Sequence, residues 1–172
     1  AARLAQHDLI VFDLDINGQS VLALVDSGAT HDFMSERLAK RLGLLPTALP
    51  SITCQMANGS RVNSSFTANA PLSFVHKNRL YSNTASFLVL KELPKYDCIL
   101  GKPFLTCFNP QIDWRANTIK FPEATSTLVP RKQIKQIRAR ANVGTMTMLE
   151  CNPRIRYIAA TVVDVDLEGH TV

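Results

Sequence analysis

The sequence predicts a mainly β domain with one or two short helices. Three observations indicate this fold class: an alternating apolar strand that ends in Asn17-Gly18, a second hairpin pattern with Asn58-Gly59 at its tip, and a short apolar strand that ends in Gly101. Asn-Gly is the strongest short hairpin signal because both residues tolerate positive φ. The order of elements is hairpin, loop, helix, hairpin, further strands and a second helix.

Composition places the chain among globular proteins. Of its 172 residues, 46% are hydrophobic and 19% are charged, whereas disordered chains are poorer in apolar residues. No apolar run approaches the ~20 residues of a membrane helix, and the first residues lack a basic-then-apolar signal pattern. We therefore expect a cytoplasmic domain that has no membrane partner.

The cysteines indicate neither a disulfide framework nor a metal site. None of them stands in a CxxC pair, and the four histidines are scattered along the chain. We expect reduced thiols, no metal and no cofactor. The residues concerned are Cys54, Cys98, Cys107 and Cys151.

Residues 8–25 predict the first hairpin. Asp13 and Asp15 alternate with apolar residues that face the other side of the strand, at positions 12, 14 and 16. The return strand SVLALV is apolar almost throughout, as in strands covered on both faces. It leads directly into Asp26.

A short helix is expected after this loop. Ser35 can cap it, Leu38 and Leu42 share one face, Gly43 suits the left-handed position that follows, and Pro46 prevents continuation.

Residues 51–66 predict the second hairpin. Ile52, Cys54 and Met56 alternate on the outgoing arm, whereas the return arm is polar, so we expect an exposed and mobile hairpin. Two further strands are expected at 70–76 and 80–90, joined by a polar turn.

The next apolar strand ends at Gly101. Pro103 suits the first position of a second helix, in which Leu105 and Phe108 face the core. Residues 111–121 predict two short strands, with Trp114 in the core or at a dimer edge.

The character of the chain changes after residue 121. A Thr/Ser-rich stretch leads to RKQIKQIRAR at 131–140, which has no acidic residue and five basic ones. We predict a domain at 1–121 and a basic C-terminal extension at 122–172. The strand-like residues near the end of this extension have no identifiable partner.

Asp26 is the strongest candidate for chemistry. Two carboxylates that share one proton can activate water and protonate a carbonyl oxygen, which suffices for peptide hydrolysis without a metal. Ser27, Gly28 and Ala29 are small enough for two such loops to meet face to face. Because the chain offers one such aspartate, the second must come from another copy, which predicts a homodimer.

Four segments carry a family resemblance, which spans residues 8–121. VLALVDSGATHDFMS resembles the catalytic segment of retropepsins, most closely those of Ty3/gypsy-type retrotransposon polyproteins. YDCILGKPFL is similar to the second retropepsin motif, NPQIDWRANTIKF to the segment after it, and MANGSRV to the tip of the flap, the hairpin that covers the cleft.

The resemblance implies a retropepsin-like acid protease fold: a closed, barrel-like β structure with a flap and one or two short helices. It implies an aspartic endopeptidase whose substrates are extended peptides of its own Gag-Pol-type polyprotein, in the cytoplasm or within virus-like particles. Gly101 would support the catalytic loop. The implied catalytic residues are Asp26, Ser27 and Gly28, and the implied substrate-binding residues are Ala29, Thr30, Met56, Ala57, Asn58 and Gly59.

The sequence departs from retroviral members at three positions. Thr30 and His31 stand where those members carry acidic residues, and Lys102 stands where they carry arginine. We therefore expect a dimer that is weaker or differently built. Asp32 keeps a carboxylate nearby without an assigned role.

Two other functions stay open at this point. The fold could serve as a peptide-binding or dimerisation module without hydrolysis, although a pure binder has no need for Asp26. The basic tail could make a weak nucleic-acid contact through phosphates, although it lacks the interleaved aromatic residues that stack on bases.

Overall fold

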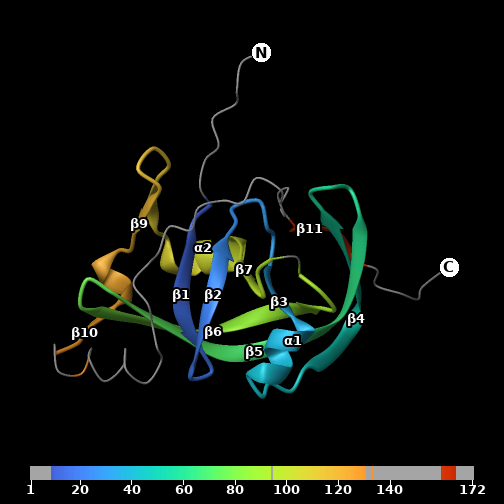
Figure 1. Cartoon of the computed structure of the whole chain (residues 1–172), viewed down its shortest axis with the longest axis horizontal. Helices are drawn as coiled ribbons and strands as arrows, with labels where there is room; N and C mark the ends of the chain where they lie inside the picture. Colours follow the sequence, from blue (N-terminus) through green and yellow to red (C-terminus); the bar gives the residue numbers. More distant parts are fainter. Residues whose placement is uncertain (1–8, 94, 131–132, 134–159, 166–172) are drawn as a thin grey trace, which may run out of the picture.

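Six strands close into a barrel. The computed structural model describes residues 9–93, 95–130, 133 and 160–165. Its main sheet has the strand order β10-β6-β3-β7-β2-β1-β5-β4-β11, and β5 also pairs with β6 (Figure 1). That extra pairing joins the two ends of the run β6-β3-β7-β2-β1-β5. The prediction of a mainly β, closed fold with short helices is confirmed.

The bounds of the elements are as follows. The strands are β1 (Val11–Ile16), β2 (Gln19–Val25), β3 (Asp32–Ser35), β4 (Thr47–Met56), β5 (Arg61–His76), β6 (Arg79–Leu90), β7 (Cys98–Leu100), β8 (Gln111–Asp113), β9 (Thr118–Lys120), β10 (Thr127–Leu128) and β11 (Ala160–Val165). The helices are α1 (Glu36–Arg41), α2 (Lys102–Phe108) and the 3₁₀ turn η1 (Glu123–Thr125).

The first hairpin and helix follow the sequence signals. Asn17 and Gly18 have φ of 51° and 80°, as a tight hairpin turn between β1 and β2 requires. In α1, the Ser35 hydroxyl accepts the backbone N–H of Leu38 at 3.0 Å, and Gly43 follows at φ 66°. Both predictions are confirmed.

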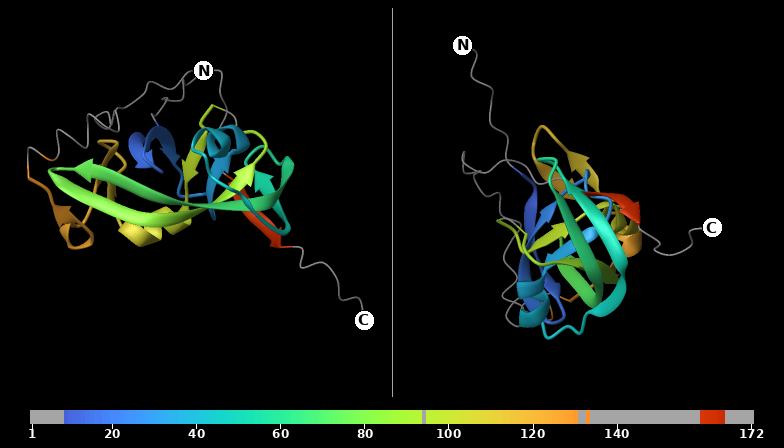
Figure 2. Two further views of the ribbon diagram at one scale, coloured as in Figure 1. Left: turned by 90° about the horizontal axis from the view of Figure 1, so that it is seen from below. Right: turned by 90° about the vertical axis from the view of Figure 1, so that its right-hand side faces the viewer.

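The prediction of a hairpin at 51–66 and a separate strand at 70–76 is wrong in one respect. Residues 61–76 form a single sixteen-residue strand, β5, which pairs first with β4 and then with β6. The alternation of buried and exposed residues breaks at Ser65 and Phe66, which are both exposed, but the strand continues because its backbone pairs with β4 through this point and with β6 after it. Figure 2 shows the resulting β5–β6 pair running along the molecule.

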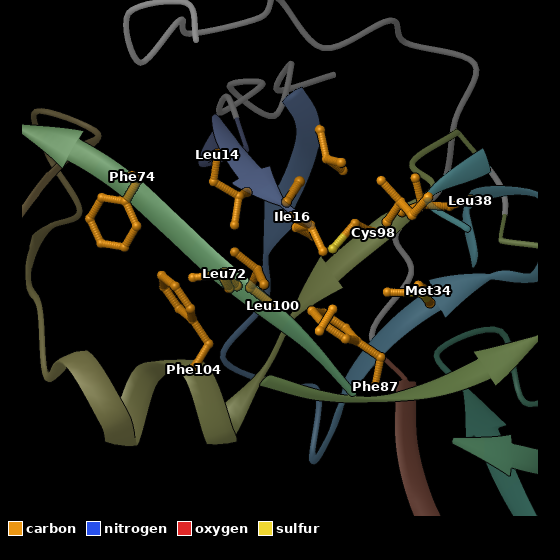
Figure 3. Close-up of a cluster of buried hydrophobic side chains, with 14 of the residues drawn as sticks. Leu14, Ile16, Met34, Leu38, Leu72, Phe74, Phe87, Cys98, Leu100 and Phe104 are labelled. Carbon is orange, nitrogen blue, oxygen red and sulfur yellow. The ribbon is translucent and has the colours of Figure 1, made fainter. Parts of the chain in front are cut away.

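The main core joins buried residues of the barrel strands with residues of α1 and α2 (Figure 3). Phe74 stacks on Tyr81 with ring centroids 4.9 Å apart and lies 4.6 Å from the ring of Phe121. Phe108 is buried in this core and the half-buried Leu105 packs against it, as predicted, and Phe104, which was not predicted, is also buried there. Phe104 and Phe108 are four residues apart, so they lie on the same face of the helix.

The region after α2 also differs from expectation. Strands β8 and β9 form a separate two-stranded sheet, as predicted. Trp114 between them is 63% exposed, so it is not part of the core of this chain. Its side chain lies at the turn of a sheet that is too short to cover it.

Packing continues beyond residue 121. Strand β10 pairs with β6, Val129 is 7% exposed, and Arg79 forms an ion pair with Glu123 at 2.6 Å. The division at residues 121/122 therefore stays a prediction. Of the basic stretch 131–140, all but residue 133 lies outside the described residues.

Candidate active site

Asp26 lies where two parallel strands end. Strand β2 pairs in parallel with β7, with Val25 opposite Leu100, and Asp26 is the next residue after β2. Its backbone N–H donates to the carbonyl of Leu100 at 2.9 Å. The loop that carries Asp26 is therefore attached to the barrel wall at its first residue.

The Asp26 carboxylate is held by its own loop. Its Oδ1 accepts the backbone N–H of Gly28 at 2.8 Å, and the Asp26 carbonyl accepts the N–H of Ala29 at 3.2 Å. Burial raises the pKa of this half-buried carboxyl above its usual value, against the opposing effect of the N–H groups of Gly28 and Ala29. An elevated pKa makes Asp26 better suited to hold a proton than a surface aspartate.

Gly101 supports this loop from behind. A Cβ at residue 101 would overlap the carbonyl oxygen of His31 and would lie 2.6 Å from that of Ala29. The next residue, Lys102, donates its backbone N–H to the Ala29 carbonyl at 2.8 Å. Only glycine permits this approach, which agrees with the supporting role that the resemblance implies for Gly101.

Asp32 joins the site, although sequence reasoning assigned it no role. Its carboxylate is 2% exposed and accepts the backbone N–H of Gly101 at 2.7 Å. Burial raises its pKa to about 6, although the N–H groups of Gly101 and Phe104 act in the opposite direction. No local signal reveals this contact, because its partners lie 69 residues apart in the sequence.

The flap residues form the tip of the β4–β5 hairpin. Met56 donates its backbone N–H to the Ser60 carbonyl at 2.8 Å, and Gly59 adopts φ 81°. The Asn58 side chain accepts hydrogen bonds from the Ser60 N–H at 2.9 Å and from the Ser60 hydroxyl at 2.7 Å. The exposed tip residues 57–60 are thus a defined turn.

The expectation of an exposed outgoing arm is wrong. Cys54 is 0% and Met56 8% exposed, and both belong to the apolar cluster that contains Ala29 of the Asp26 loop. Only the return arm is mainly exposed. The alternating apolar residues of β4 pack against this apolar cluster. The polar sequence of the partner strand β5 gives no indication that the cluster lies on the other side of β4.

The departures from the retroviral pattern lie at the surface of the loop. Thr30 and Lys102 are exposed and His31 is half-buried, and the Thr30 hydroxyl lies 3.1 Å from Nδ1 of His31. Within the described residues, the ion pairs join Arg37 to Asp97, Lys40 to Glu36 and Arg79 to Glu123. These pairs lie outside the Asp26 loop.

The described part of the chain offers neither a metal-binding cluster nor a membrane-spanning helix. It contains no cluster of three His, Cys, Asp or Glu side chains that could hold a metal ion. Its α-helices have six and seven residues, too few to cross a bilayer.

A known protein family matches most of the chain. The family model for the PEG10/RTL1 protease domain matches residues 22–128, which include Asp26, the flap and Gly101. Comparison with curated proteins gives no match.

Two solved structures are similar to this chain. The retroviral protease-like domain of Ddi1 from Leishmania major is 21% identical, with a TM-score of 0.54, and the match covers 73% of this chain and 97% of that one. A retropepsin-like aspartic protease from Rickettsia conorii is 19% identical, with a TM-score of 0.42 and coverage of 64% and 88%. The first likeness supports the predicted retropepsin-like fold.

Proposed function

Because the chain belongs to the PEG10/RTL1 protease-domain family, we propose that it is an aspartic endopeptidase that acts as a homodimer. The observation that carries this proposal is the Asp26 loop. Its carboxylate is half-buried, has a raised pKa and is positioned by backbone N–H groups at the end of two parallel strands. Burial is the main cause of that shift. The chain offers one such aspartate loop, so we propose that the second carboxylate comes from another copy.

The mechanism uses two copies of Asp26. When the two loops meet across a twofold axis, like charges in proximity disfavour double ionisation, so the pair retains one proton. The ionised member takes a proton from water as the water attacks the peptide carbonyl. The protonated member donates to the carbonyl oxygen. Ser27 and Gly28 keep the loop narrow enough for this approach, and Thr30 is exposed where a substrate could contact it. Ala29, expected to bind substrate, is instead 1% exposed and packs in the apolar cluster below the loop.

The substrate class follows from the flap. A β-hairpin offers main-chain hydrogen bonds to a peptide in extended conformation, and side-chain pockets then provide selectivity. We propose that residues 56–59 cover such a peptide, and that the natural substrates are segments of a Gag-Pol-type polyprotein that includes this chain.

A cleavage assay tests the proposal. Asp26→Asn keeps the size of the side chain but cannot share a proton as a carboxyl pair does, so we expect hydrolysis of an extended-peptide library at mildly acid pH to disappear. Asp13→Asn is the matched control, because Asp13 is another partly buried carboxyl whose pKa burial raises, on strand β1. We expect the control to retain activity. Hydrolysis that survives Asp26→Asn would contradict the proposal.

Protein concentration provides a second test. If two chains form one site, specific activity rises with concentration and then saturates, in step with the dimer fraction seen by sedimentation. A chain that binds extended peptides as a dimer but never hydrolyses them would instead be a binding module.

A further inference from the structure

Strand β11 lies on the flap. Its backbone runs antiparallel to β4, from Ala160 opposite Met56 to Val165 opposite Ile52, with an irregularity between Val162 and Asp164. Figure 1 shows β11 beside β4. Strand β4 is thus the partner that the sequence left unidentified for the strand-like residues of the C-terminal extension.

This pairing uses the last free edge of the flap strand. Over the same residues, β5 occupies the opposite edge of β4, with Ile52 opposite Ser64 and Gln55 opposite Arg61. A β-strand has two hydrogen-bonding edges and no more. Any extended peptide that adds to β4 by main-chain hydrogen bonds therefore needs the edge that β11 covers.

We propose that residues 160–165 are an internal competitor for the peptide-binding edge of the flap. This inference rests on the proposed function and adds a regulator to it: the C-terminal extension reduces access of other peptides until it leaves β4. The segment ATVVDV is rich in β-branched residues, which favour the extended conformation such a ligand needs.

The competitor is part of the same chain, so its inhibitory effect can be distinguished from the effect of dimerisation by varying the protein concentration. Its effective concentration is set by the covalent connection and does not change with dilution. Inhibition by β11 is therefore independent of protein concentration, whereas assembly of two Asp26 loops is not.

A pair of prolines removes the strand without changing the rest of the chain. Successive strand residues direct their N–H groups to opposite edges, so Thr161→Pro with Val162→Pro necessarily removes one donor that points to β4. The matched control is Thr161→Val with Val162→Ile, which keeps both N–H groups and the β-branched character.

Hydrogen exchange reads the pairing directly. In the full-length chain carrying Asp26→Asn, we expect the proline pair to accelerate amide exchange within Ile52–Met56 by about tenfold or more, with slow exchange retained in β2 and β7. A synthetic peptide of residues 158–167 should restore slow exchange. Equal exchange rates in the parent, the control and the proline variant would overturn the inference.

Kinetics then tests the consequence. With Asp26 intact, we expect the proline pair to lower KM for an added peptide about fivefold or more and to leave kcat unchanged, since each lost hydrogen bond weakens the competitor by a few-fold or more. An unchanged KM in a variant that shows faster exchange overturns competition. If no form of the chain hydrolyses peptides, the proposed function fails, and the exchange measurement alone decides whether the edge is occupied.

Discussion

The carboxylate of Asp32 accepts the backbone N–H of Gly101 at 2.7 Å. This contact joins the first residue of β3 to the start of α2, where Gly101 has no side chain to act as a cap. Because Gly101 also lies against the carbonyl groups of Ala29 and His31, Asp32 supports the Asp26 loop through Gly101. Stability and activity should both depend on this support.

Asp32→Asn should change how stability depends on pH. The pKa of Asp32 is raised from 3.8 to about 6, so the folded chain binds more protons than the unfolded chain within that window. This contribution to stability is therefore present below pH 4 and lost as pH rises through 6. Asn does not titrate, so the variant does not lose this stability. The difference in free energy of unfolding, variant minus parent, should therefore increase by up to about 3 kcal/mol as pH rises across this range.

Denaturant titrations at fixed protein concentration, from pH 4 to pH 7, measure this difference. Asn keeps an acceptor for Gly101, whereas Asp32→Leu leaves buried N–H groups unpaired and should cost about 2–5 kcal/mol at every pH. Parallel pH profiles for the parent and Asp32→Asn would show that Asp32 does not titrate in this range.

Gly101→Ala should be far more damaging than Gly18→Ala. At residue 101 a methyl group meets backbone oxygens that cannot move independently, and we expect a loss of about 3 kcal/mol or more together with loss of peptidase activity. Gly18 has φ 80° but nothing within 4 Å of an added Cβ, so its substitution should cost about 1 kcal/mol. Thermal unfolding compares the two, and equal costs would contradict the packing described here.

Ser35→Ala should destabilise the chain by about 1–2 kcal/mol at neutral pH. The hydroxyl caps α1 and also donates to Asp97 at 2.8 Å. Burial would raise the pKa of Asp97, but hydrogen bonds from Arg37 and Ser35 hold it below 3.8, so this stabilisation is lost as pH falls through that region. The exposed Ser51→Ala is the control, and a cost that does not shrink at pH 3 would count against the Asp97 contact.

Phe121→Ala should cost about 3–5 kcal/mol. Its ring is 8% exposed and contacts Phe74 and Tyr81, whose hydroxyl donates to the Phe121 carbonyl at 3.2 Å. Leu128→Ala, at a position that is 70% exposed, should be nearly neutral. Chemical denaturation of both variants tests whether the core reaches the end of the predicted domain, and a small effect at Phe121 would place that end earlier.

Local signals predicted the elements well. Three local features were predicted correctly: the turn at Asn17-Gly18, the Ser35 cap and the glycine after α1. Each depends on a few consecutive residues, so the local sequence is enough to predict it. The length of β5 and the burial of Cys54 did not follow from such signals. The length of β5 depends on its pairing with β6, and the burial of Cys54 depends on the apolar cluster against which β4 packs.

The sequence by itself determined that Asp26 follows an apolar strand in a loop of small residues, and that one chain carries one such aspartate. Only the tertiary structure decided that Gly101 and Asp32 support this loop and that residues 160–165 pair with the flap strand. The physical reason is the range of the interactions. A turn or a cap forms between neighbours in the chain, whereas a buried carboxylate or a strand edge finds its partner through closure of the barrel.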